Sequence, residues 1–195
     1  MIKINRPPCP YPEALSHSNY KHSKNKEALR KANFDKCMYC ESKISHIDFA
    51  EIEHIKPKAS DKYPELTYTW ENLGYVCSVC NNSKGEKYIE TNPYIDPYSE
   101  VPKVHIVAVG AFLFHRDGSE RGEITIFDIG LDRDRLIEKR QTRIEEIVKA
   151  ITACYRTHDI TLRNNAINEL KKEMQPDKEY SLIIEGAMRQ YGIIA

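Results

Sequence analysis

The sequence predicts an α+β protein in which a small cysteine-rich module precedes a β-hairpin and a C-terminal helical region. Two Cys-x-x-Cys pairs enclose a segment of irregular periodicity, β-favouring residues are frequent over 103–128, and apolar residues recur at helical spacing after Gly130. The expected boundaries are 1–35 for an N-terminal arm and basic helix, 36–90 for the module, 91–130 for a linker and hairpin, and 131–195 for the helical region.

The composition is typical of a globular protein that does not enter a membrane. The chain has 195 residues, with 41% hydrophobic and 30% charged residues, enough for one or two small domains. No apolar run approaches the roughly 18 residues of a membrane span. The first eight residues lack the apolar core of a signal peptide. We therefore expect a cytoplasmic protein without a membrane partner.

Charge is balanced over the chain but uneven along it. Basic and acidic residues number 29 each, which is unusual for a protein that must hold a polyanion unaided. Residues 1–35 carry seven basic and three acidic side chains. The candidate polyanion-binding residues there are Lys21, Lys24, Lys26, Arg30 and Lys31. A solvated helix face explains the same charges equally well, and the neutral total favours weak intrinsic affinity or the help of a partner.

The order of elements follows from local pattern. Four prolines between positions 7 and 12 predict an extended arm, and the polar, basic stretch 13–33 predicts a helix. Alternation over 47–55 predicts a strand. The β-rich stretches 103–115 and 122–128, separated by a turn at Asp117-Gly118, predict a hairpin.

Three helices are expected after Gly130. The first begins with Asp132 as its cap, the second covers about 160–174, and the third covers 178–190. These helices form either a C-terminal core or a docking surface for another protein.

Four of the six cysteines form the pairs Cys37/Cys40 and Cys77/Cys80. Two residues between the cysteines let each pair bind one tetrahedral ion, and four thiolates complete a closed structural zinc site. The 36 residues between the pairs exceed the gap of common zinc ribbons. A redox pair would need a βαβ context, which the pattern lacks. Cys9 and Cys154 are expected to be unpaired thiols.

Three short motifs accompany the cysteine pairs: Glu51-Ile-Glu53-His54-Ile-Lys-Pro57, Trp70-Glu-Asn72-Leu73 and Asn81-Asn82-Ser83-Lys84-Gly85. Together they resemble the HNH (ββα-metal) endonuclease family in its zinc-containing form. The outline of that form is C-x-x-C, [DE]-H-I-x-P, N-L and C-x-x-C-N-x-x-K-G, and every part is present in order. The resemblance covers about 50 of 195 residues and implies metal-dependent hydrolysis of phosphodiester bonds.

The resemblance assigns a role to each motif residue. His54 is the general base, since a neutral imidazole can accept a proton from water. Glu53 and Asn81 bind the catalytic cation, and as oxygen donors they favour Mg²⁺ or Mn²⁺. Asn72 braces the loop between the strands, and Lys84 is expected to contact a phosphate near the helix start.

Two features qualify these assignments. Many relatives have Asp before the histidine and His as the last ligand, where this chain has Glu53 and Asn81. Glu51 shares a strand face with Glu53 but matches no motif, so we interpret it as a solvated or supporting residue. Because Glu53 and His54 are adjacent, a bend or strand end is needed for both to serve one site.

Shorter matches elsewhere resemble the retron- and Septu-associated PtuB-like HNH nucleases. They are the opening Ile-Lys-Ile-Asn-Arg-Pro, Leu66-Thr-Tyr-Thr-Trp-Glu-Asn-Leu, Asn92-Pro93 and Ile129-Gly-Leu-Asp. This resemblance implies an effector nuclease of anti-phage defence that works with a PtuA-like ATPase on nucleic acid, with DNA preferred and RNA possible. The alternatives are a stand-alone restriction or repair nuclease and a non-catalytic zinc nucleic-acid-binding module.

Overall fold

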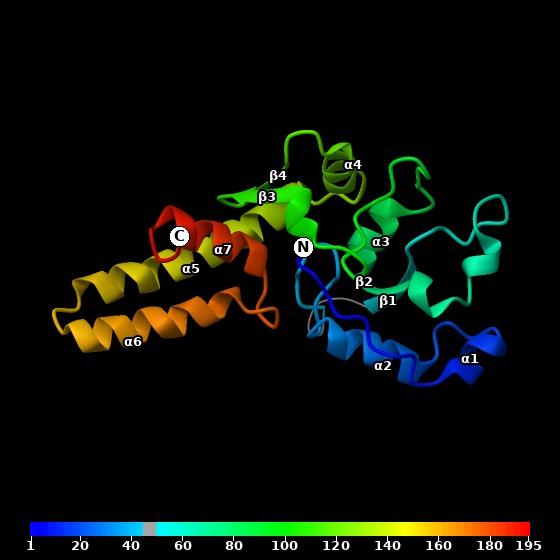
Figure 1. The fold of residues 1–195 in the computed structure, drawn as a ribbon, viewed down its shortest axis with the longest axis horizontal. Helices are drawn as coiled ribbons and strands as arrows, with labels where there is room; N and C mark the ends of the chain where they lie inside the picture. The colour runs from blue at the N-terminus through cyan, green and yellow to red at the C-terminus, as the bar shows by residue number, and fades with distance from the viewer. Residues whose placement is uncertain (45–49) are drawn as a thin grey trace.

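The computed structural model describes residues 1–44 and 50–195, and it confirms the α+β class. Figure 1 shows a compact region built from the first two thirds of the chain and a pair of long helices that extends away from it. Within the described residues, no helix is both long and apolar enough to cross a membrane.

Two short helices, and not one, follow the extended N-terminal arm. They are α1 (Pro12–Ser16) and α2 (Ser23–Ala32). The single helix expected here is wrong because Ser18, with a left-handed φ of 60°, closes α1. The arm is extended as predicted, and Ile4 is buried where its N–H donates to the Pro97 carbonyl oxygen at 2.8 Å.

A ββα unit forms the centre of the compact region. β1 (Ala50–His54) pairs antiparallel with β2 (Leu73–Cys77), with Glu53 opposite Gly74, and α3 (Ser78–Lys84) follows β2 directly. Two 3₁₀ turns lie between the strands, η1 (Pro64–Leu66) and η2 (Trp70–Asn72).

The first strand is confirmed where the structure describes it. The prediction covered 47–55, of which 47–49 lie outside the described residues. On β2, a Cβ atom at Gly74 would lie 2.3 Å from Met38 Sδ, so a larger residue would require the buried Met38 side chain to move. This close approach packs the cysteine loop onto the strands.

The predicted hairpin exists, but both of its strands lie in the first β-rich stretch. β3 (Ile106–Val109) pairs with β4 (Phe112–His115), and the chain turns at Gly110, whose φ is 56°. The second stretch, 122–128, is not a strand, and the turn expected at Asp117-Gly118 leads into a helix.

That helix is α4 (Glu120–Asp128). The hydroxyl of Ser119 accepts a hydrogen bond from the Gly122 N–H at 3.1 Å and so caps the first turn. A Cβ atom at Gly122 would lie 2.4 Å from the His105 carbonyl oxygen. The cap and this packing outweigh the β-favouring composition of the segment, so the strand prediction is wrong here.

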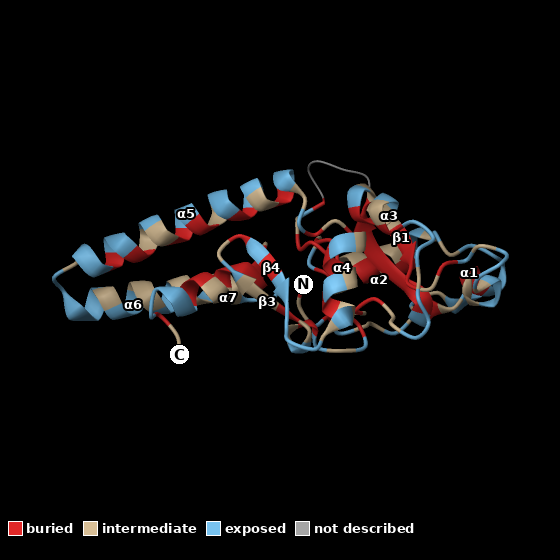
Figure 2. Ribbon diagram, turned by 90° about the horizontal axis from the view of Figure 1, so that it is seen from above, coloured by how far each residue is buried: buried red, intermediate tan, exposed pale blue. Residues whose placement is uncertain are grey.

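The three C-terminal helices are confirmed as α5 (Asp134–Arg156), α6 (Ile160–Lys171) and α7 (Ser181–Gln190). The remaining 3₁₀ turns are η3 (Pro102–Val104) and η4 (Lys172–Met174). The cap expected at Asp132 is wrong by one residue, because Arg133 precedes α5 and makes no side-chain cap. Figure 2 shows a buried stripe along one side of α5 and exposed residues along the other.

Buried polar contacts join α7 to the first cysteine loop. The Ser181 hydroxyl donates to Glu41 Oε2 at 2.7 Å, and the Lys36 ammonium donates to the Lys178 carbonyl oxygen at 2.7 Å. Lys36 Nζ also lies 3.7 Å from Glu41 Oε2. The helical region is therefore anchored to the cysteine-rich region through charged groups excluded from water.

Candidate functional site

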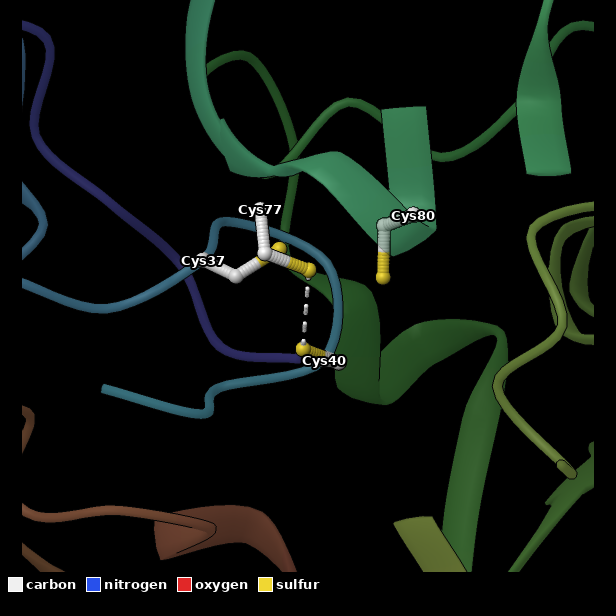
Figure 3. Close-up of side chains that lie close together, drawn as sticks. All are labelled: Cys37, Cys40, Cys77 and Cys80. Carbon is white, nitrogen blue, oxygen red and sulfur yellow. Dashed lines mark hydrogen bonds between the residues drawn. The ribbon is translucent and has the colours of Figure 1, made fainter. Parts of the chain in front are cut away.

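The four paired cysteines converge at one buried point. Their Sγ atoms all lie within 4.8 Å of one another. Figure 3 shows Cys37 and Cys40 on one loop, with Cys77 at the end of β2 and Cys80 in α3. Sulfurs bound to zinc at about 2.3 Å lie about 3.8 Å apart, and the Cys40 and Cys77 Sγ atoms are 3.9 Å apart. The geometry fits a tetrahedral zinc ion.

The surroundings of the cysteine cluster also fit a zinc tetrathiolate, which carries an excess of negative charge. Arg133 Nη1 donates to Cys80 Sγ at 3.6 Å. Arg140 is 1% exposed, and although burial lowers its pKa, the Cys40 sulfur opposes that shift. Buried anionic clusters need such cations. Cys9 and Cys154 lie apart from the cluster as free thiols, as predicted.

Two polar pairs connect β1 with α3. Glu51 and Glu53 alternate along the strand and share a face, whereas Asn81 and Lys84 lie one turn apart on the helix. The Asn81 amide nitrogen donates to Glu51 Oε2. Lys84 Nζ lies 2.6 Å from Glu53 Oε1. The strand and the helix thus bring two carboxylates and an amide together.

The pair of Glu53 and Lys84 is almost fully buried, with side-chain exposures of 3% and 1%. Burial raises the pKa of Glu53 to about 7, and the Lys84 ammonium opposes this shift. The contact lacks hydrogen-bond geometry, so Glu53 Oε1 is buried without a hydrogen bond among the residues that the structure describes. A carboxylate is the kind of oxygen ligand that a hard divalent cation prefers.

The phosphate contact expected for Lys84 does not fit this arrangement. Its ammonium is buried and donates a hydrogen bond to the His54 carbonyl oxygen at 3.0 Å. From this position Lys84 favours the ionised form of Glu53 and connects α3 to the end of β1.

His54 is the last residue of β1, and it lines the same cleft as Glu53, consistent with the predicted strand end. Its Nε2 lies 3.0 Å from the Thr67 carbonyl oxygen. Because a carbonyl only accepts, Nε2 carries the hydrogen and Nδ1 is the basic nitrogen. Burial lowers the pKa of His54 to about 4, which the bond to Thr67 only partly offsets, so the ring is neutral at pH 7.

Asn72 braces the connection between the strands. Its side-chain oxygen accepts from the Lys56 N–H at 2.7 Å, and its amide donates to the carbonyl oxygens of Lys56 at 2.9 Å and Leu66 at 3.2 Å. Leu66 precedes Thr67, whose carbonyl orients His54. These contacts connect the two ends of the segment between the strands and place Asn72 next to His54.

These residues open onto a cleft of about 550 Å³. Its lining contains Glu51, Glu53, His54, Asn81 and Asn82. Three lysines also line it: Lys21, Lys26 and Lys58. Lys21 and Lys26 belong to the basic N-terminal set, whereas Arg30 pairs with Glu27 and Asp35 outside the cleft. Part of the basic segment therefore forms one wall of the site.

Sequence reasoning missed Tyr20 and Lys58. The Tyr20 ring lies edge-on to the His54 ring, with centroids 4.5 Å apart, and Lys58 Nζ donates to the Tyr20 hydroxyl at 2.5 Å. No local pattern marks either residue, because they meet His54 only in the folded chain. The contact of Glu51 with Asn81 was also missed, although the shared strand face of Glu51 and Glu53 was a usable signal.

The cysteine cluster, the ββα unit and the histidine at its strand end together define a ββα nuclease with a four-cysteine site that fits zinc. The family model of HNH endonucleases matches residues 37–87. The Septu protein PtuB of Bacillus thuringiensis is 30% identical over 179 residues, covering 84% of this chain and 67% of the relative. The chain belongs to the HNH endonuclease family and is related to the Septu PtuB proteins.

Two further relatives support this assignment. The Septu protein PtuB of Bacillus mycoides (strain KBAB4) is 28% identical over 188 residues, with coverage of 80% of this chain and 64% of the relative. A Vibrio cholerae protein, named as an HNH endonuclease of retron Vc95, is 29% identical over 136 residues, with coverage of 64% and 66%. The matched part of the chain thus spans about two thirds of each relative.

Proposed function

We propose that this HNH endonuclease hydrolyses phosphodiester bonds of nucleic acid, with DNA as the preferred substrate, in the cleft between β1, α3 and the segment from Tyr20 to Lys26. The observation that carries the proposal is the convergence of His54, Glu53 and Asn81 on this one cleft. His54 is neutral, its Nδ1 accepts no hydrogen bond among the described residues, and the other two are oxygen donors. Binding alone would require none of these three groups, which argues against a non-catalytic module.

The catalytic cation in this proposal is Mg²⁺ or Mn²⁺, held by Glu53 and Asn81, while zinc is structural and held by the four cysteines. Few protein ligands suit Mg²⁺, which keeps several of its waters. When bound, such a cation neutralises charge on the phosphate and stabilises the leaving oxygen.

His54 performs the proton transfer. As a water oxygen forms its bond to phosphorus, the water proton passes to Nδ1, and the bond to the leaving sugar oxygen breaks with its electron pair. Solvent then protonates that oxygen. The Thr67 carbonyl holds the ring in the tautomer that keeps Nδ1 free. Burial keeps the imidazole neutral before the reaction.

We also propose that the protein acts in anti-phage defence in the cytoplasm, together with a PtuA-like ATPase. The support is the similarity to relatives named Septu protein PtuB and to the retron relative. The near-neutral chain is consistent with a partner that supplies part of the substrate affinity. A stand-alone restriction or repair role is the competing function, and the absence of an ATPase gene beside this one would favour it.

The test is nicking of plasmid DNA and cleavage of structured RNA with Mg²⁺, with and without the ATPase. Wild type should cleave DNA, and His54→Ala should abolish cleavage while retaining zinc and fold. His158→Ala, which alters an exposed histidine in the helical region, serves as the control and should remain active. Equal cleavage by His54→Ala, or no cleavage by wild type under any of these conditions, contradicts the proposal.

A further inference from the structure

We infer that Glu51 is a positioning residue of the catalytic cation site, acting through the amide of Asn81. The inference rests on the proposed function and adds a residue that no motif assigns. It starts from one contact, the hydrogen bond that the Asn81 amide nitrogen donates to Glu51 Oε2.

A carboxylate fixes which end of an amide faces it. A carboxylate has acceptors only, so the Asn81 side chain presents its NH₂ group to Glu51. The planar amide then holds Oδ1 on the side away from Glu51, where an oxygen can serve a cation. Without the carboxylate, a half-turn about χ2 exchanges NH₂ for oxygen, and an NH₂ group cannot bind a cation.

The backbone holds Glu51 in place for this role. In β1 it lies opposite Val76 of β2, and strand alternation puts it on the same face as Glu53. The two carboxylates therefore approach α3 at successive positions of one face, Glu51 beside Asn81 and Glu53 beside Lys84. Glu53 is available as a ligand, while Glu51 orients the second ligand. Residues that orient a ligand in this way commonly change metal affinity when they are replaced.

A second carboxylate of the cleft makes it possible to distinguish an effect of Glu51 on the orientation of the Asn81 amide from an effect of its negative charge. Glu86 is exposed and lines the same cleft, but among the described residues its side chain makes no hydrogen bond with Asn81. If Glu51 acted only by adding negative charge to the cleft, removing Glu86 would have a similar effect. If it acts through the amide, its effect must depend on Asn81.

The experiment is a double-mutant cycle on the full-length, zinc-loaded protein, read by the binding of free Mn²⁺ measured by electron paramagnetic resonance. The variants are Glu51→Met, Asn81→Ala, the double variant and the control Glu86→Met. Glu51→Met should weaken Mn²⁺ binding by about 10- to 100-fold. In the Asn81→Ala background the same change should have little further effect. Glu86→Met should bind Mn²⁺ within about twofold of wild type.

Equal binding by wild type and Glu51→Met, or effects of Glu51→Met and Asn81→Ala that multiply, would overturn the inference. Zinc content and thermal unfolding check the fold, and Glu51→Ala removes the carboxylate without apolar bulk should the methionine variant fail to fold. If wild type binds Mn²⁺ and cleaves but the cycle is additive, only this inference fails. If wild type neither binds Mn²⁺ nor cleaves, the inference and the proposed function both fail.

Discussion

At the scale of single residues, the orientation of His54 depends on a backbone carbonyl that is itself held in place. The Thr67 carbonyl accepts from the imidazole, and the adjacent Leu66 carbonyl accepts from the Asn72 amide. Asn72 is 5% exposed and also bonds both backbone groups of Lys56. One buried side chain thus connects the two ends of the segment between the strands, next to His54.

Replacing Asn72 by alanine should therefore affect both stability and cleavage. Three hydrogen bonds are lost and buried backbone groups lose their partners, so unfolding in urea should show a loss of about 2–4 kcal/mol. The cleavage rate at saturating Mg²⁺ should fall because Thr67 no longer holds His54 firmly. Asn92→Ala, which removes an exposed bond to Glu120, is the matched control and should change both quantities little. A fully active Asn72→Ala variant would show that the brace is not needed for catalysis.

A site residue could be predicted where the chemistry imposes a short, fixed spacing in the sequence, and not where its contacts come from distant parts of the chain. The cysteine pairs and His54 stand in fixed local spacings, and a tetrahedral site or a strand end imposes such spacings on the chain. Tyr20 had no such signal, because it reaches His54 from the segment between α1 and α2. The burial of Lys84 could not be predicted either. Its spacing from Asn81 indicates that the two residues share a helix face, but not which residues cover that face.

At the scale of elements, α4 shows why the pattern of residues 122–128 failed as a guide. Isoleucine, threonine and phenylalanine there favour a strand, yet the Ser119 cap and the close approach of Gly122 to the His105 carbonyl select a helix. The three C-terminal helices were predictable because apolar residues recur at helical spacing over long stretches of the sequence. The break between α1 and α2 was not, because it depends on one left-handed serine.

Substitution of Gly122 by alanine tests this packing, because the expected change in stability is opposite to the usual one. Alanine normally stabilises a helix interior relative to glycine by about 1 kcal/mol. Here the new Cβ would meet the His105 carbonyl oxygen at 2.4 Å, so Gly122→Ala should instead destabilise the protein by about 1–3 kcal/mol. Urea unfolding measures the change, and Glu123→Ala, at an exposed position of α4, should be nearly neutral. A stabilised Gly122→Ala protein would show that α4 does not pack against that carbonyl as described.

Two exposed lysines that line the cleft can be compared with two exposed lysines outside it. Lys21 and Lys58 are exposed and line the cleft, whereas Lys24 and Lys31 are exposed on α2 outside it. Changing the first two to glutamine should weaken DNA binding and reduce the slope of log affinity against log salt by about 0.9 for each lost phosphate contact. The double change of Lys24 and Lys31 should leave the slope nearly unchanged. Equal effects of the two pairs would favour a diffuse basic surface over a wall of the cleft.

At the scale of the whole molecule, the cysteine cluster connects parts of the chain that lie far apart in sequence. Glu41, within the first cysteine loop, accepts from Ser181 at the start of α7. Arg133, just before α5, donates to Cys80. Without zinc, the cysteine residues that position Arg133 and Glu41 would no longer be held together. We therefore expect the metal to stabilise the C-terminal helical region as well as the ββα unit.

Removal of zinc tests this coupling. Structural zinc contributes an apparent 10–16 kcal/mol or so in zinc-finger peptides, about as much as the entire stability of a typical domain. Chelation, or Cys40→Ser, should thus expose the amides of β2 and α3 to hydrogen exchange. Because Glu41 and Ser181 are anchored to the same loop, the first turn of α7 should lose protection with them. Cys9→Ser, at an unpaired thiol, should retain zinc and full protection. A zinc-free protein in which α7 stays as protected as before would show that the helical region folds independently of the metal.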